Sequence, residues 1–83
     1  MDKLEILKQN LKARVEEIQN YQINIDNFER GIKKIDEKYL DNQKMIDFKN
    51  RLIELLEDNR TEQLKAIIIH DVIQDQIQEM EDQ

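Results

Sequence analysis

Apolar residues recur through the first half of this chain at alternating spacings of three and four, which is the heptad pattern of coiled coils. A repeat of 3.5 residues keeps one stripe of an under-wound α-helix against a partner helix, whereas a β-strand would show a period of two. The pattern therefore predicts one helix over about residues 2–40, interrupted in its stripe only by Arg14. The heptad core of this helix comprises Leu4, Leu7, Leu11, Ile18, Tyr21, Ile25, Phe28, Ile32, Ile35 and Tyr39.

Proline is absent from the 83 residues, and Gly31 is the only glycine. The residues that usually form the turns of β-hairpins and irregular loops are therefore nearly absent, which favours an all-α fold in a single domain. Gly31 costs a helix interior about 1 kcal/mol relative to alanine. Because Phe28 and Ile32 keep the heptad register across it, we expect the helix to continue, with Gly31 allowing a close approach or a slight bend.

The polar residues Asp41-Asn42-Gln43 are the next interruption. Asp and Asn favour turns and helix N-caps, so we expect the chain to reverse here. A second helix is expected over about residues 44–57. The following segment Glu57–Gln63 has no apolar side chain, and Asn59 followed by Glu62 resembles a capping box.

Two topologies remain open for the second half. Either a short loop near 58–60 separates a third helix over about 60–81, or that helix is continuous with the second. The predicted fold class is therefore a long antiparallel helical hairpin or a three-helix coiled-coil bundle. A chain this short buries little surface by itself, so we expect oligomerisation to complete the bundle.

Residues 64–80 are apolar nearly all round a helical wheel, which indicates burial on more than one side. Leu64, Ile67 and Ile68 lie on one side of this wheel. One face is expected to pack on the first helix, and the other to meet a second copy or a partner protein. We assign to this oligomer or partner face the nearly opposite group Ile69, Ile73, Ile77 and Met80.

Three polar residues in or near the first heptad stripe are candidates for fixing register or partner choice. Arg14 occupies a core position, where it either snorkels to solvent or pairs with a carboxylate of another helix. Asn24 and Asn27 interrupt strong helix formers, and they either face solvent or donate hydrogen bonds across a bundle or to a partner.

The formal net charge of −6 arises in the second half of the chain. Residues 41–83 carry five Lys or Arg and eleven Asp or Glu, whereas residues 1–40 carry eight of each. The acidic surface at the end comprises Asp71, Asp75, Glu79, Glu81 and Asp82. This surface either provides solubility or binds a basic partner. Direct nucleic-acid binding is not expected, because phosphate contacts require Lys and Arg.

Few residues suit catalysis. The chain has no Cys or Ser, one threonine, Thr61, and one histidine, His70, so no enzyme activity, cofactor or metal site is expected. No apolar run approaches the roughly 18 residues of a membrane-spanning helix. We therefore expect a soluble cytoplasmic protein that contacts no membrane.

Four segments resemble small helical proteins encoded by tailed bacteriophages. They are Val15–Ile18, Tyr21–Phe28, Phe48–Leu56 and Glu62–Ala66. The resemblance implies a viral accessory protein working in a bacterial cytoplasm, and it carries no activity or site residues.

The sequence predicts a non-enzymatic, homo-oligomeric module that binds and modulates an unidentified partner protein. With the phage resemblance, one form of this hypothesis is an inhibitor of a host or defence complex, comparable to an anti-CRISPR protein. Two alternatives remain. One is an acidic nucleic-acid mimic that occupies a basic groove on its partner, and the other is a coiled-coil scaffold of a larger assembly.

Overall fold

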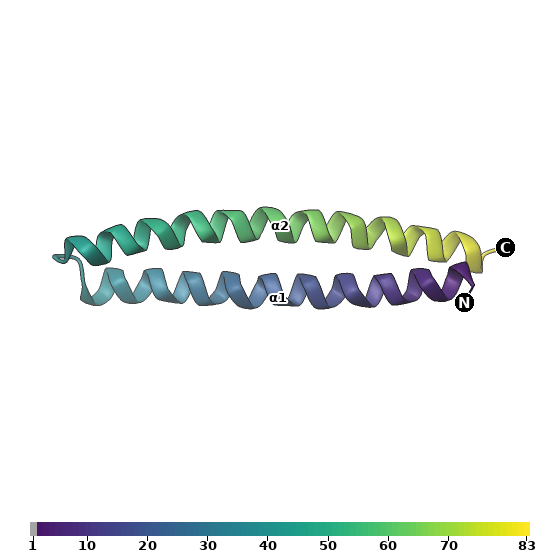
Figure 1. Ribbon diagram of the computed structural model, residues 1–83, viewed down its shortest axis with the longest axis horizontal. Coiled ribbons are helices and arrows are strands. Elements are labelled where there is room, and N and C mark those ends of the chain that lie inside the picture. The colour runs from purple at the N-terminus through teal and green to yellow at the C-terminus, as the bar shows by residue number, and fades with distance from the viewer. Residues whose placement is uncertain (1) are drawn as a thin grey trace.

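The structure, a computed structural model that describes residues 2–83, consists of two long antiparallel helices (Figure 1). Helix α1 spans Lys3–Lys38 and helix α2 spans Gln43–Glu81. The hairpin measures 63 × 16 × 15 Å between its Cα atoms, and both chain ends lie at the same end of it. The predicted all-α hairpin is thus confirmed, in its two-helix form.

Both helices begin at a side-chain cap of the expected type. The Asp2 carboxylate accepts a hydrogen bond from the Glu5 backbone N–H at 2.8 Å, and the Asn42 side chain accepts one from the Met45 N–H at 3.2 Å. Each cap satisfies one of the four backbone donors that a helix leaves free at its start. Asn42 thereby fixes where α2 begins, directly after the reversal of the chain at residues 39–42.

The helix expected over about residues 2–40 is found at residues 3–38, but the expected core role of Tyr39 is wrong. Helix α1 ends at Lys38, and the Tyr39 N–H makes the last hydrogen bond, to the Ile35 carbonyl at 2.8 Å. The side chain of Tyr39 is 46% exposed. The chain turns here because Asn42 must cap α2, so Tyr39 belongs to the connection instead of the contact between helices.

Helix α2 has no break near residues 58–60, so the alternative with a third helix is not adopted. Asn59 acts inside the helix, where its Nδ2 donates to the Leu55 carbonyl oxygen at 2.7 Å. Its Oδ1 accepts a hydrogen bond from Asn24 Nδ2 of α1 at 3.3 Å. Because these contacts occupy the Asn59 side chain, it does not cap a new helix with Glu62.

The hydrophobic core is a single seam between the two helices. Its buried α1 residues are Leu7, Ile25 and Ile35, all from the predicted heptad stripe. The other stripe residues of α1 are half-buried. From α2 the buried residues are Leu52, Leu56, Ala66, Ile73 and Ile77. With only one packed layer, every core side chain stays near solvent.

The α2 half of the seam follows the same alternation of three and four residues, but through polar side chains. Its buried and half-buried residues are Met45, Lys49, Leu52, Leu56, Asn59, Gln63, Ala66, His70, Ile73, Ile77 and Met80. The middle of this stripe therefore offers three polar residues and one alanine to α1. The ends of the stripe are mainly apolar, so the seam changes character along its length.

Gly31 lies where the two helices approach closely. A Cβ atom at this position would come within 3.1 Å of Leu52 Cδ1. That distance is tighter than ordinary van der Waals contact, so the Leu52 methyl would have to move by a few tenths of an ångström. The expected close approach at Gly31 is confirmed.

Neither helix has a stretch that is both long and apolar enough to cross a membrane, within residues 2–83.

Candidate interaction surfaces

The residues assigned from the sequence to a partner face mostly belong to the hairpin's own core. Ile73 and Ile77 are buried together with Leu7 of α1, and Met80 packs against the same cluster. Of the four assigned residues only Ile69 is open to solvent, with 47% of its surface exposed. The assignment is therefore wrong for Ile73, Ile77 and Met80, because the apolar end of the α2 seam needs them to face α1, whereas Ile69 keeps an exposed side chain.

The apolar residues that α2 turns outward are Leu64, Ile68 and Val72. Leu64 and Ile68 are 60% and 61% exposed. Because residues four apart lie on one helix face, these three side chains form a continuous row on the side of α2 away from α1. In the same segment Asn59, Gln63 and His70 lie in the seam, so the segment carries polar residues inside and apolar residues outside.

Acidic side chains continue this row toward the end of the chain. Asp75 and Glu79 follow Val72 on the same face, and both are exposed. The predicted acidic residues Asp71, Glu81 and Asp82 are also exposed. Asp71 lies 3.0 Å from His70 Nδ1, and Glu81 pairs with Lys8 of α1 at 3.3 Å. We call the row of Leu64, Ile68, Val72, Asp75 and Glu79 the outer strip.

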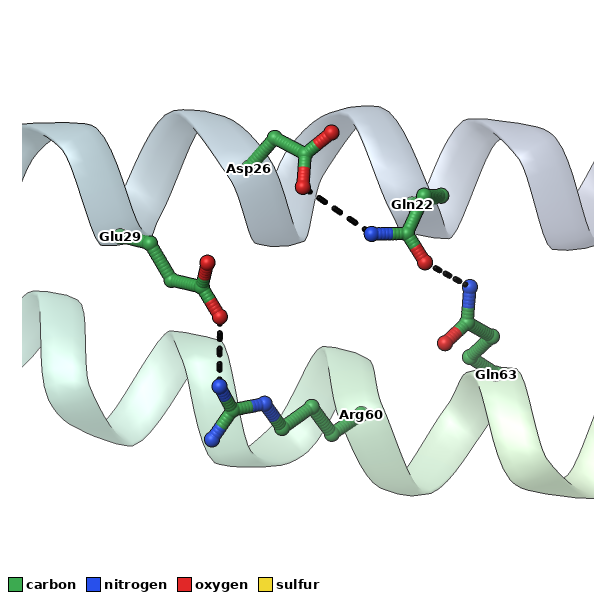
Figure 2. A network of polar contacts seen from close by, with 5 residues as sticks. All are labelled: Gln22, Asp26, Glu29, Arg60 and Gln63. Carbon is green, nitrogen blue, oxygen red and sulfur yellow. Dashed lines mark hydrogen bonds and ion pairs between the residues drawn. The ribbon is translucent and has the colours of Figure 1, made fainter.

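A polar network crosses the middle of the hairpin (Figure 2). Gln63 Nε2 of α2 donates to Gln22 Oε1 at 2.9 Å and to the Ile18 carbonyl oxygen at 3.3 Å. Gln22 Nε2 in turn donates to Asp26 at 3.0 Å, and Arg60 pairs with Glu29 at 2.5 Å. These contacts pair specific residues of α1 and α2, so they favour one antiparallel register.

The three polar residues proposed for register or partner choice have different surroundings. Arg14 lies in the seam, with its Nε 3.0 Å from Glu17 of its own helix. That Nε is shielded from solvent, and none of residues 2–83 makes a well-formed hydrogen bond with it. Asn24 reaches across to Asn59, whereas Asn27 is exposed and has no hydrogen bond to the described residues.

The two broad sides of the hairpin differ. Ion pairs link the helices on one side, Lys8 with Glu81 and Glu29 with Arg60. Each of these four residues directly follows a seam residue, namely Leu7, Met80, Phe28 and Asn59. Positions of this kind flank one side of a coiled-coil seam. We call it the ion-pair side.

The opposite side carries one residue of α2 in every heptad, namely the residue directly before Lys49, Leu56, Gln63, His70 or Ile77. These are Phe48, Leu55, Glu62, Ile69 and Gln76, at intervals of seven residues. On α1 the equivalent residues include Asn10, Asn24 and Gly31, whose side chains are short or absent. Phe48 and Ile69 are therefore 51% and 47% exposed. We call this the open side.

The ion-pair side has isoleucines at its equivalent α2 positions, Ile46, Ile53 and Ile67, and these are half-buried. The α1 residues beside them are longer, and Gln22, Glu29 and Asp36 reach toward α2. Asp36 pairs with Lys49 at 2.5 Å. The ion-pair side is therefore bridged by its own polar side chains, whereas on the open side Phe48 and Ile69 stay exposed and Leu55 is half-buried.

Groups suited to catalysis do not gather anywhere in the described part of the chain. Among the described residues His70 makes a polar contact only with its neighbour Asp71, and Thr61 is exposed. Over residues 2–83 no three His, Asp or Glu side chains are arranged to hold a metal ion.

Comparisons with protein-family models, with curated proteins and with solved structures found no match to this chain.

Sequence reasoning missed the outer strip and the polar part of the α2 seam. The signal was present as spacing, because the alternation of three and four residues runs through Asn59, Gln63 and His70 to Ile73. A search weighted by hydrophobicity passes over these polar positions. It is drawn instead to the isoleucines around residue 68, which α2 turns outward.

Proposed function

We propose that this protein is a non-enzymatic module that binds a partner protein through the outer strip of α2. The proposal rests on one observation about the middle of α2. There the apolar side chains of Leu64 and Ile68 face solvent, whereas the polar side chain of Gln63 faces α1. Leaving such a side chain exposed forgoes about 1.5 to 3 kcal/mol of burial energy. Exposed apolar rows with a polar rim are typical of protein-binding surfaces.

The residue types in the outer strip indicate what kind of partner surface would bind it. Leu64, Ile68 and Val72 need an apolar surface, and Asp75 and Glu79 need basic side chains beyond it. The matching partner surface is therefore apolar at one end and rich in Lys or Arg at the other. Because exposed ion pairs are screened by salt, the acidic part contributes more to the association rate and to specificity than to affinity.

The resemblance to phage proteins suggests one specific form of this proposal. The partner is then a protein of the bacterial host or of a defence complex, and the module is its inhibitor.

The experiment compares three purified proteins as immobilised bait in bacterial extract: the full chain, a Leu64→Gln/Ile68→Gln variant and an Ile23→Gln variant. Ile23 is a matched control because it is an exposed isoleucine of α1, outside the strip. We expect a protein that the full chain and Ile23→Gln retain, that Leu64→Gln/Ile68→Gln loses, and that raised salt partly releases. Equal retention by all three proteins would refute the outer strip as a binding site.

The acidic residues provide a second candidate function, that of a nucleic-acid mimic. Asp71, Asp75, Glu79 and Asp82 are exposed along one end of α2. This function predicts retention that survives Leu64→Gln/Ile68→Gln but is lost in an Asp75→Asn/Glu79→Gln variant. The same assay therefore separates the two functions.

A further inference from the structure

We infer that the open side of the hairpin binds a second copy of this chain, in an antiparallel two-fold arrangement that pairs α2 with α2. This contact would complete a four-helix bundle, the usual way for helical hairpins to bury a second face. The surface adjoins the outer strip, because Ile69 lies three residues before Val72 on the helix. The inference does not, however, depend on the strip binding a foreign protein.

The first support is that two of the three apolar residues on the open side of α2, Leu55 and Ile69, lie symmetrically about the middle of the helix, whereas Phe48 falls opposite Gln76. Helix α2 spans residues 43–81, and Glu62 is its midpoint. Leu55 and Ile69 lie seven residues to either side of Glu62 on the open side. At 1.5 Å per residue this is about 10 Å in each direction. A two-fold axis at Glu62 therefore brings Leu55 of each copy opposite Ile69 of the other.

The same axis overlaps the two hairpins along their full length. Because the axis passes through the midpoint of α2, neither end of either hairpin projects beyond the other. A two-fold contact of this kind is closed, so it stops at two copies instead of growing into a fibre.

The second support is charge complementarity near the axis. Lys65 lies three residues after Glu62 and Asp58 lies four residues before it, so the axis brings Lys65 of one copy within one residue of the level of Asp58 of the other. Both residues are exposed, and Asp58 has no ion pair with residues 2–83. The two Glu62 carboxylates meet at the axis and repel each other, and the Lys65 ammonium 3.0 Å from each of them offsets part of this repulsion.

The third support is that the open side lacks most of the polar contacts between helices that the ion-pair side has. There Gln22, Glu29 and Asp36 extend across the seam toward α2 and half-cover Ile53 and Ile67. On the open side the only polar contact between helices is that of Asn24 with Asn59, among residues 2–83. The open side can therefore accept another helix without breaking an ion pair.

The test begins with sedimentation equilibrium of the full chain and three variants. We expect a dimer that dissociates on dilution, and at least ten-fold weaker association for Leu55→Glu and for Ile69→Lys. A chain carrying both substitutions should recover much of the loss, because each introduced Glu then faces an introduced Lys. The control Val15→Glu, an exposed apolar position on the ion-pair side, should leave association unchanged.

A cysteine test does not depend on these substitutions being tolerated. The chain has no cysteine, so a single one reports on its own position. Glu62→Cys should form a disulfide-linked dimer under mild oxidation, because its two copies meet at the axis. Gln74→Cys, which directly follows Ile73 on the ion-pair side, should not. A monomer at all concentrations, open-ended growth, or equal cross-linking of the two variants would overturn the inference.

Discussion

The terminal and central sections of the hairpin use the same heptad spacing with opposite chemistry. In the terminal section Leu4, Leu7 and Leu11 of α1 pack against an apolar cluster of α2 formed by Ile73, Ile77 and Met80. In the central section Ile18, Tyr21 and Ile25 face an α2 stripe of Asn59, Gln63, Ala66 and His70. The first section is held mainly by apolar burial, whereas the second combines the burial of Ile25 and Ala66 with hydrogen bonds and an ion pair.

The difference separates stability from specificity. Burial stabilises without regard to register, because any apolar side chain of similar size can fill the seam. Polar pairs such as Gln22 with Gln63 contribute little free energy, but a shifted register would leave them unsatisfied. The terminal section therefore contributes mainly stability, and the polar pairs of the central section select the alignment of the two helices.

The largest expected effect comes from breaking the terminal section. Ile77→Ala removes a buried side chain from the cluster with Leu7, and we expect the free energy of unfolding to fall by about 2 to 4 kcal/mol. Urea unfolding followed by circular dichroism measures this loss. If Ile77→Ala does not fold, Ile77→Val should still fold, with a loss of about 1 kcal/mol. A smaller loss would show that this section does not anchor the hairpin.

Replacing a polar seam residue of the central section by an apolar one should raise the free energy of unfolding instead of lowering it. Asn59→Leu places an apolar side chain in the seam, and we expect the free energy of unfolding to rise by about 1 kcal/mol. The uniqueness of the fold should decline, which a broadened amide NMR spectrum would reveal. Asn27→Leu is the matched control at an exposed position of α1, and its stability should change by less than about 0.5 kcal/mol. A loss of stability in Asn59→Leu would contradict the proposed division of roles.

The ion pairs of the two sections allow a finer comparison. Double-mutant cycles with alanine at Arg60 and Glu29, and at Lys8 and Glu81, should each give a coupling energy of about 0.2 to 1 kcal/mol. We expect the two couplings to be similar, because the side chains of both pairs are about half exposed. Added salt should weaken both couplings. A clear difference between the two couplings would show that solvent exposure does not decide their strength.

Gly31, in the section nearest the connection, should show the smallest effect. Gly31→Ala gains about 1 kcal/mol of helix propensity. The added Cβ, however, meets Leu52 Cδ1 at 3.1 Å, and this crowding offsets the gain. We expect a net change in unfolding free energy within about 0.5 kcal/mol of zero. A loss above about 1 kcal/mol would mean that Leu52 cannot shift.

The α1 half of the fold was predictable because its stripe is apolar at every position except Arg14. The α2 half was not, since Lys49, Asn59, Gln63 and His70 occupy seam positions that hydrophobic patterning does not recognise. The error about the partner face has the same origin. Patterning shows that residues 64–80 are apolar on two sides, but which side faces α1 depends on the register.

Tyr39 illustrates a different limit. Its spacing fits the heptad stripe, but the end of a helix is decided by local capping as well as by apolar periodicity. The hydrogen bond from the Met45 N–H to Asn42 caps α2 at its start, so the chain reverses before α1 can add another turn that would include Tyr39.

The elongated shape has a consequence for how the molecule diffuses. A rod of 63 × 16 × 15 Å experiences more friction than a sphere of equal mass, so it sediments slowly and tumbles anisotropically. Side-by-side pairing on the open side would thicken this rod without lengthening it. The frictional ratio should therefore fall as the mass doubles, whereas end-to-end association would raise it.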